Sequence, residues 1–172
     1  MIDAPSDIMD YKTHLTELGP LKHHYFTHSH KVIAGVQKID HLLGVKTERP
    51  GLWQWDIKET GLSQKQISED LTIVYTPGHT NDSVFICWLD GGITRCFTGD
   101  TLFLRNNSLF KPIVYSTDNK LLNQTLKQVQ GLHVDWVYGS VSDNRSTFGY
   151  HVRDNAQWIA QLNKCIAQTR TE

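Results

Sequence analysis

The stretch that most constrains the fold of this chain is the turn Thr76-Pro77-Gly78-His79-Thr80, because it joins two runs typical of β-strands. The run 71–75 is rich in β-branched and aromatic residues, and the run 83–88 has the same character. A histidine on a tight turn at a strand end is held rigidly and still reaches solvent. The short stretches 27–30 and 98–101 each follow another strand-like run and carry histidine or aspartate. We therefore predict that three turns converge on one metal ion.

The size and charge of the chain limit what it can be. A chain of 172 residues favours one domain, here 1–172, with one sizeable core. The formal charge is −1, with 17 basic and 18 acidic residues, so the balance gives no reason to expect nucleic acid or an anionic membrane as a partner. No apolar run approaches the roughly 20 residues that span a bilayer. The N-terminus lacks the basic and apolar regions of a signal peptide, so we expect none.

The number and spacing of the cysteines indicate the redox compartment of the protein. Cys87, Cys96 and Cys165 are widely spaced and odd in number, and the first two lie in apolar strand-like runs. Buried thiols in a reducing compartment are the preferred interpretation, and we expect a cytoplasmic protein. Cys87 and Cys96 flank a hairpin turn, so a disulfide between them is the alternative.

Strand-like and helix-like patterns alternate along the chain, which favours an α/β fold. Predicted helices begin at capping residues, Asp118 or Asn119 for one and Asp154 for another, and end at glycines such as Gly44 and Gly131. The predicted strands span 24–27, 71–75, 83–88, 93–98 and 134–138, with a weak strand or ordered loop at 53–57. The predicted helices span 8–18, 31–43, 119–129 and 154–166, and loops are predicted at 106–108 and 139–149.

The order of these motifs resembles the metallo-β-lactamase-fold hydrolases, and their glyoxalase II-like branch most. In that branch a serine follows Thr-Pro-Gly-His-Thr, and Gly-Asp-Thr-Leu-Phe is common; here Ser83 and 99–103 match. The resemblance runs from about Met1 to about Val152 and implies a four-layer αβ/βα sandwich with metals at one edge of two sheets. The family usually has two or more strands before the point where this chain begins. We therefore expect a fold shortened at the N-terminus, and a homodimer could cover the gap.

The resemblance also implies a set of metal ligands. By position, His28 and His30 match the first pair of the family's His-x-His-x-Asp-His motif. His79 matches the third ligand of the first metal, and Asp100 matches the carboxylate that bridges both metals. Ligand histidines usually donate their other N–H to an oxygen.

The residues of the family's second metal site are replaced here. Val32 and Ile33 stand where the family has aspartate and histidine, and neither can bind a metal. Ser140 follows Gly139 where the family has a histidine. His151 lies further along the chain, and its spacing assigns it no role. The resemblance therefore implies one metal ion, zinc or alternatively iron, bound by His28, His30, His79 and Asp100.

Such a site predicts a metal-dependent hydrolase. Three imidazoles and a water suffice for catalytic zinc, which lowers the pKa of its water to about 7. Asp100 could orient or deprotonate that water, and is the predicted catalytic residue. Loss of the second metal favours a small-molecule substrate with a good leaving group, such as a thioester or another small ester. Thr80 and Ser83 are expected to support His79. Trp53 and Trp55 are expected in the core or at an interface, with the lining of a substrate pocket as the alternative.

Two other functions fit the same residues. His28, His79 and Asp100 make two histidines and one carboxylate, the facial set of non-haem iron(II) oxygenases. The resemblance includes persulfide dioxygenases, which use the matching positions. The replaced second site also fits a catalytically inactive protein that keeps the fold for a binding or structural role. Metal content distinguishes this last function from the two enzymes.

Overall fold

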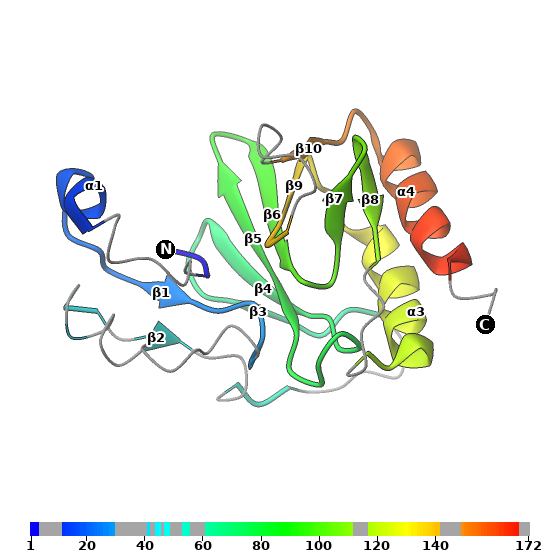
Figure 1. Cartoon of the computed structure of the whole chain (residues 1–172), viewed down its shortest axis with the longest axis horizontal. Coiled ribbons are helices and arrows are strands. Elements are labelled where there is room, and N and C mark those ends of the chain that lie inside the picture. Colours follow the sequence, from blue (N-terminus) through cyan, green and yellow to red (C-terminus); the bar gives the residue numbers. More distant parts are fainter. Residues whose placement is uncertain are drawn as a thin grey trace.

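In the computed structural model, the two C-terminal helices lie on one side of a six-stranded sheet and a pair of short strands lies on the other (Figure 1). Helices α3 (Asn119–Gln128) and α4 (Asn155–Ala167) lie side by side on the first side. Strands β1 (His24–Tyr25) and β2 (Thr47–Glu48) lie on the second side and pair in parallel. The predicted α/β class is confirmed. The structure describes residues 1–3, 12–29, 41, 44–45, 47–48, 53–55, 61–111, 117–141 and 149–168.

The central sheet has the strand order β10-β9-β6-β5-β4-β3. Its strands are β3 (Gln64–Gln66), β4 (Leu71–Tyr75), β5 (Val84–Asp90), β6 (Ile93–Gly99), β9 (Trp136–Gly139) and β10 (Tyr150–His151). The turn between β5 and β6 contains Gly91 and Gly92, both with positive φ, and forms the predicted hairpin. Strands β6 and β9 are parallel, with Gly99 opposite Gly139. Their carboxyl ends therefore lie at the same edge of the sheet.

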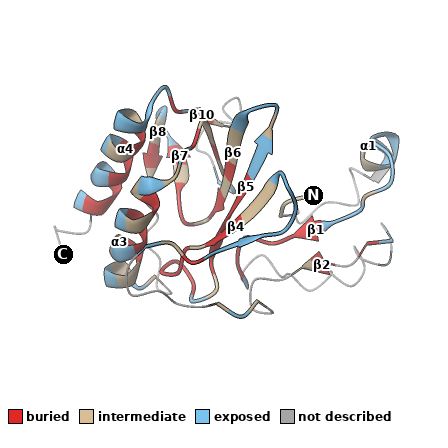
Figure 2. Ribbon diagram, turned by 180° about the vertical axis from the view of Figure 1, so that it is seen from behind, coloured by how far each residue is buried: buried red, intermediate tan, exposed pale blue. Residues whose placement is uncertain are grey.

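Alternating side chains of the sheet serve two cores, as the period of two along a strand requires. On β5, Phe85 and Cys87 pack with the buried residues of α3 and α4, including Leu122 and Trp158. The intervening Ile86 packs with Tyr25 on the opposite side. Figure 2 shows the buried faces of both helices turned to the sheet and the exposed faces turned outward.

Both predicted helix starts near the C-terminus are confirmed, and of the two candidate caps at the first, Asp118 rather than Asn119 is the cap. The Asp118 side chain accepts a hydrogen bond from the backbone N–H of Leu121, and Asp154 accepts one from Gln157. Helix α3 continues into a short 3-10 turn, η4 (Val129–Gly131), which contains the predicted terminal glycine.

Several short elements were not predicted. Strands β7 (Phe103–Arg105) and β8 (Ser108–Phe110) form a hairpin, and the turn between them places Asn106 and Asn107 at φ +49° and +56°. The predicted loop at 106–108 is the turn of this hairpin, except that Ser108 already begins β8. The two flanking strands were missed, because strands this short show too little alternation to be recognised. Helix α1 (Lys12–Glu17) lies within predicted helix 8–18, whereas predicted helix 31–43 falls outside the described residues except at His41.

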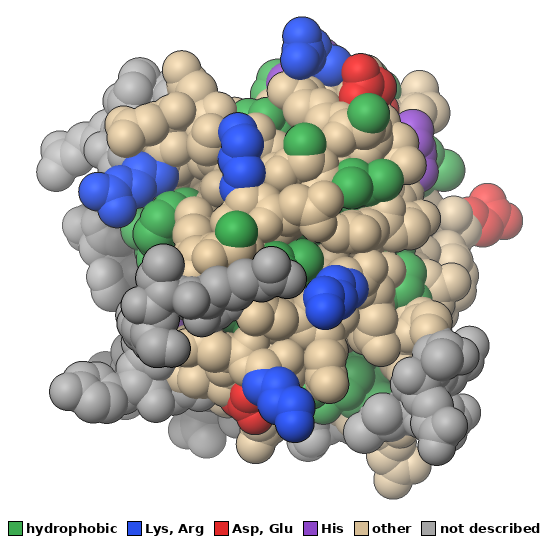
Figure 3. Space-filling model, turned by 90° about the vertical axis from the view of Figure 1, so that its right-hand side faces the viewer, with side chains coloured by type: hydrophobic (Ala, Val, Ile, Leu, Met, Phe, Trp, Pro, Cys, Tyr) green, Lys and Arg blue, Asp and Glu red, His purple; other side chains and the backbone are tan. Residues whose placement is uncertain are grey.

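On the surface over α3 and α4, the lysine and arginine side chains are spread over the face and do not gather in one patch (Figure 3). Within the described ranges, no helix has both the length and the apolar character that crossing a membrane requires.

Candidate metal centre

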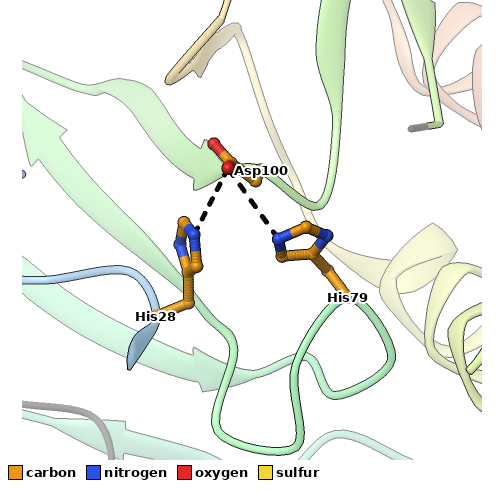
Figure 4. Close-up of side chains that lie close together, drawn as sticks. All are labelled: His28, His79 and Asp100. Atoms are coloured by element: carbon orange, nitrogen blue, oxygen red, sulfur yellow. Dashed lines mark ion pairs between the residues drawn. The ribbon is translucent and has the colours of Figure 1, made fainter. Parts of the chain in front are cut away.

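Three predicted ligands from distant parts of the chain lie together at one edge of the sheet (Figure 4). His28 follows β1, His79 lies in the turn between β4 and β5, and Asp100 directly follows β6. One potential ligand atom from each residue lies within 4.8 Å of the other two. Among the described residues, this is the group of histidine, cysteine or acidic side chains that could hold a metal ion.

The Nε2 atoms of both imidazoles face one carboxylate oxygen of Asp100. Nε2 of His28 lies 3.3 Å from Oδ2 of Asp100, and Nε2 of His79 lies 3.8 Å from it. The two rings are nearly perpendicular, at 86°, with centroids 5.0 Å apart. The histidine side chains are 1% and 3% exposed, whereas that of Asp100 is 18% exposed. Two buried nitrogens and a partly accessible carboxylate oxygen form a donor set suited to zinc or iron.

Helix α3 fixes the turn that carries His79. The Thr125 hydroxyl donates to the carbonyl of Pro77 at 2.6 Å, and the backbone N–H of Asp118 donates to the carbonyl of Gly78 at 2.8 Å. Gly78 has φ +135°, and a Cβ there would lie 2.5 Å from the Cα of Leu122. A glycine at position 78 is therefore required for the turn to approach the helix so closely.

Thr80 and Ser83 hold the same turn from its other end. The Thr80 backbone N–H donates to the Ser83 hydroxyl at 3.0 Å, and the two hydroxyl oxygens lie 2.7 Å apart. The Thr80 hydroxyl also donates to Asp82 at 2.7 Å. These contacts support His79 through the backbone of its turn.

Hydrogen-bonded side chains lie on the Nδ1 side of the His28 ring, opposite the Nε2 atom that faces Asp100. Nδ1 of His28 is 3.0 Å from the Thr27 hydroxyl, which donates to the Asp3 carboxylate at 2.8 Å. The Ser140 hydroxyl donates to the same carboxylate oxygen at 2.9 Å. Sequence reasoning did not assign Asp3 to the site. The available signal was its place at the start of the stretch, from about Met1, that carries the family resemblance.

The remaining residues considered for the site lie in different places relative to the three ligands. His30, Val32 and Ile33 fall outside the described residues. Ser140 lies beside the centre, because its backbone N–H donates to the carbonyl of Gly99 at 3.0 Å. His151 lies away from the cluster, exposed on β10, with its ring centroid 4.9 Å from that of Trp136.

The two tryptophans considered as pocket residues pack against the core. The Trp55 ring stacks on Tyr75 with centroids 5.2 Å apart, and Trp53 meets Trp55 edge to face. Both pack against the buried cluster that contains Ile73. In the described part of the chain, residues 53–55 form no strand.

Comparisons with known proteins bear on the family and the fold of this chain. The family model described as "Metallo-beta-lactamase superfamily" matches residues 14–141. Among solved structures, a metallo-β-lactamase superfamily protein from Sulfolobus tokodaii, ST1585, has a TM-score of 0.60 at 15% identity, over 100% of this chain and 77% of its own. A metallo-β-lactamase from Erythrobacter litoralis, with β-mercaptoethanol in its active site, has a TM-score of 0.63 at 12% identity, over 95% and 79%. The BLEG-1 B3 metallo-β-lactamase has a TM-score of 0.61 at 16% identity, over 95% and 87%.

At such low identities, the likeness to solved structures shows a shared fold. A search of curated protein sequences found no match.

Proposed function

Because this chain belongs to the metallo-β-lactamase superfamily, we propose that it is a metal-dependent hydrolase that uses one metal ion, held by His28, His79 and Asp100. The observation that carries this proposal is the convergence of three donor atoms within 4.8 Å of one another. His30 stays a predicted further ligand. The second site of the family is proposed to be degenerate, because Val32, Ile33 and Ser140 replace its ligands.

The residues present fit a transition metal. The two Nε2 atoms and the carboxylate oxygen that they face are donor types that zinc accepts, and all three would bind one cation. Bound zinc supplies Lewis acidity, which lowers the pKa of water to about 7 at such centres. The buried His28 and His79 would hold the ion, whereas the more accessible Asp100 can also accept a hydrogen bond from an attacking water.

The proposed substrate is a small thioester or another small ester. Two metals normally share the charge of nucleophile and leaving group, and a single ion cannot do so. A good leaving group such as a thiolate needs less of that help. The sequence likeness to the glyoxalase II-like branch, through Ser83 and 99–103, supports the same substrate class.

Metal analysis combined with a hydrolysis panel tests this function. We expect about one equivalent of zinc per chain and turnover of a thioester, a lactone or a phosphodiester. His79→Ala should lose most of the metal and the turnover, whereas the matched control His133→Ala replaces a histidine that is 77% exposed and should change neither. Two equivalents of metal per chain would contradict the single-ion proposal. A metal-free, inactive wild type would favour a binding or structural role.

A second function is favoured by the composition of the described cluster. Two histidines and one carboxylate form the facial set of non-haem iron(II) oxygenases. Iron in the purified protein, together with oxygen consumption on addition of a persulfide, would place this function ahead of hydrolysis. Zinc with no oxygen uptake would exclude it.

A further inference from the structure

We infer that Ser140, Asp3 and Thr27 are positioning residues, joined in a hydrogen-bond relay that fixes His28 with its proton on Nδ1. The relay runs from Ser140 to Asp3 at 2.9 Å, from Thr27 to Asp3 at 2.8 Å, and between Thr27 and His28 at 3.0 Å. The effect of this relay on metal binding rests on the proposed function, whereas the position of the His28 proton does not depend on that function.

The direction of the relay follows from the number of protons available. A carboxylate only accepts hydrogen bonds, so the single proton of the Thr27 hydroxyl points at Asp3. The hydroxyl oxygen then has only lone pairs for His28, and Nδ1 must be the donor. The lone pair of neutral His28 is therefore on Nε2, the atom that faces Asp100.

The surroundings of the relay keep the Thr27 hydroxyl in place. The Thr27 side chain is 1% exposed, and its backbone N–H donates to the other Asp3 oxygen at 2.9 Å. The backbone of Asp3 has φ +50°, and its N–H donates to the carbonyl of Tyr25 at 2.8 Å. Gly99 closes the opposite side, since a Cβ there would lie 2.6 Å from the Cβ of Thr27. The hydroxyl is thus enclosed on both sides.

Ser140 gives the relay its particular form in this chain. It stands where the family has a ligand histidine of the second metal. Here its hydroxyl instead donates to Oδ2 of Asp3, the same oxygen that receives the Thr27 proton. Because Ser140 is itself tied to Gly99 through its backbone N–H, it fixes the orientation of the carboxylate. The residue that replaces a ligand of the second metal therefore supports a ligand of the first metal.

The decisive variant is Asp3→Asn, which reverses the relay without changing its shape. The retained oxygen would still accept from the Thr27 backbone, and the new NH2 group would donate to the Thr27 and Ser140 hydroxyls. The Thr27 proton would then go to Nδ1 of His28 and leave the imidazole proton on Nε2. We expect the zinc affinity to fall by about 10- to 100-fold, the usual effect of losing such an outer partner.

Two pairs of variants make the test specific. Thr27→Val removes the hydroxyl and should weaken zinc binding as Asp3→Asn does, whereas Thr27→Ser keeps the hydroxyl and should bind zinc within about twofold of wild type. Ser140→Ala removes one donor only and should cause a smaller loss. Thermal unfolding of each metal-free variant checks that it is folded.

Nitrogen-15 NMR of metal-free protein, at a pH where the imidazoles are neutral, reads the proton position directly. We expect His28 with Nδ1–H in wild type and Thr27→Ser, and with Nε2–H in Asp3→Asn. Nε2–H in wild type, or unchanged tautomer and zinc affinity in Asp3→Asn, would overturn the relay. Failure of the hydrolysis panel with the expected NMR result would count against the proposed function alone.

Discussion

Gly99 and Thr27 pack so closely that a Cβ at position 99 would lie 2.6 Å from the Cβ of Thr27 and 3.3 Å from Nδ1 of His28. Gly99 ends β6 directly before Asp100, and Thr27 directly precedes His28. This single contact therefore sets how closely two of the proposed metal ligands approach one another.

Gly99→Ala should disturb the centre by steric overlap and by backbone strain. The residue has φ +55°, where a side chain costs about 1–2 kcal/mol, and overpacking adds about 1–3 kcal/mol. Urea unfolding should show this loss of stability, and calorimetry should show weaker zinc binding. Gly91→Ala is the matched control, because its φ is +57° and nothing lies near the added Cβ. Equal losses in both variants would show that the Thr27 contact has no importance.

Thr125→Val should loosen the turn that carries His79. The Thr125 hydroxyl is buried and donates to the carbonyl of Pro77, so its loss leaves a buried acceptor unsatisfied at a cost of about 1–3 kcal/mol. We expect lower stability in urea unfolding and a lower zinc affinity. Thr72→Val is the control, since it removes an exposed hydroxyl that donates to Gln66. A stable variant with unchanged zinc binding would contradict the anchoring role of α3.

Cys165 should make the protein less stable at alkaline pH. Burial raises the pKa of this thiol from its ordinary value of 9.0 to about 12. Above about pH 9 the unfolded chain releases a proton that the folded chain keeps, so the free energy of unfolding falls by up to about 1.4 kcal/mol per pH unit until about pH 12. Urea unfolding from pH 7 to 10.5 should show a steeper fall in wild type than in Cys165→Ala. Parallel curves would refute this contribution.

Cys87 and Cys96 should stay reduced and unreactive in the folded protein. They are direct cross-strand partners with sulfur atoms 3.0 Å apart, and the structure holds both as free thiols. Burial raises the pKa of Cys96 well above its ordinary value, and the thiolate is the reactive form. A chromogenic thiol reagent should detect almost no thiol before unfolding and all three cysteines in denaturant. A mass lower by two hydrogens would instead reveal the disulfide.

The local sequence determined the elements with enough residues to show a pattern. The apolar runs that became β4, β5 and β6 are long enough to indicate strands, and the two-glycine turn fixes the register of β5 and β6. Asp118 and Asp154 mark helix starts because capping is a contact between near neighbours. The motif order also identified His28, His79 and Asp100 as candidates for one centre. Strands of two or three residues, such as β3 and β10, have no such local signal.

Only the tertiary structure decided what surrounds those three residues. The Ser140 and Asp3 side chains meet although 137 positions separate them, because the parallel pairing of β6 with β9 places Ser140 beside Gly99. His151, which as a histidine could itself bind a metal, instead lies with its ring against Trp136. Periodicity and turn chemistry are local properties that a sequence displays directly. The partners of a buried hydroxyl or carboxylate depend on how distant strands pair, which residue spacing does not record.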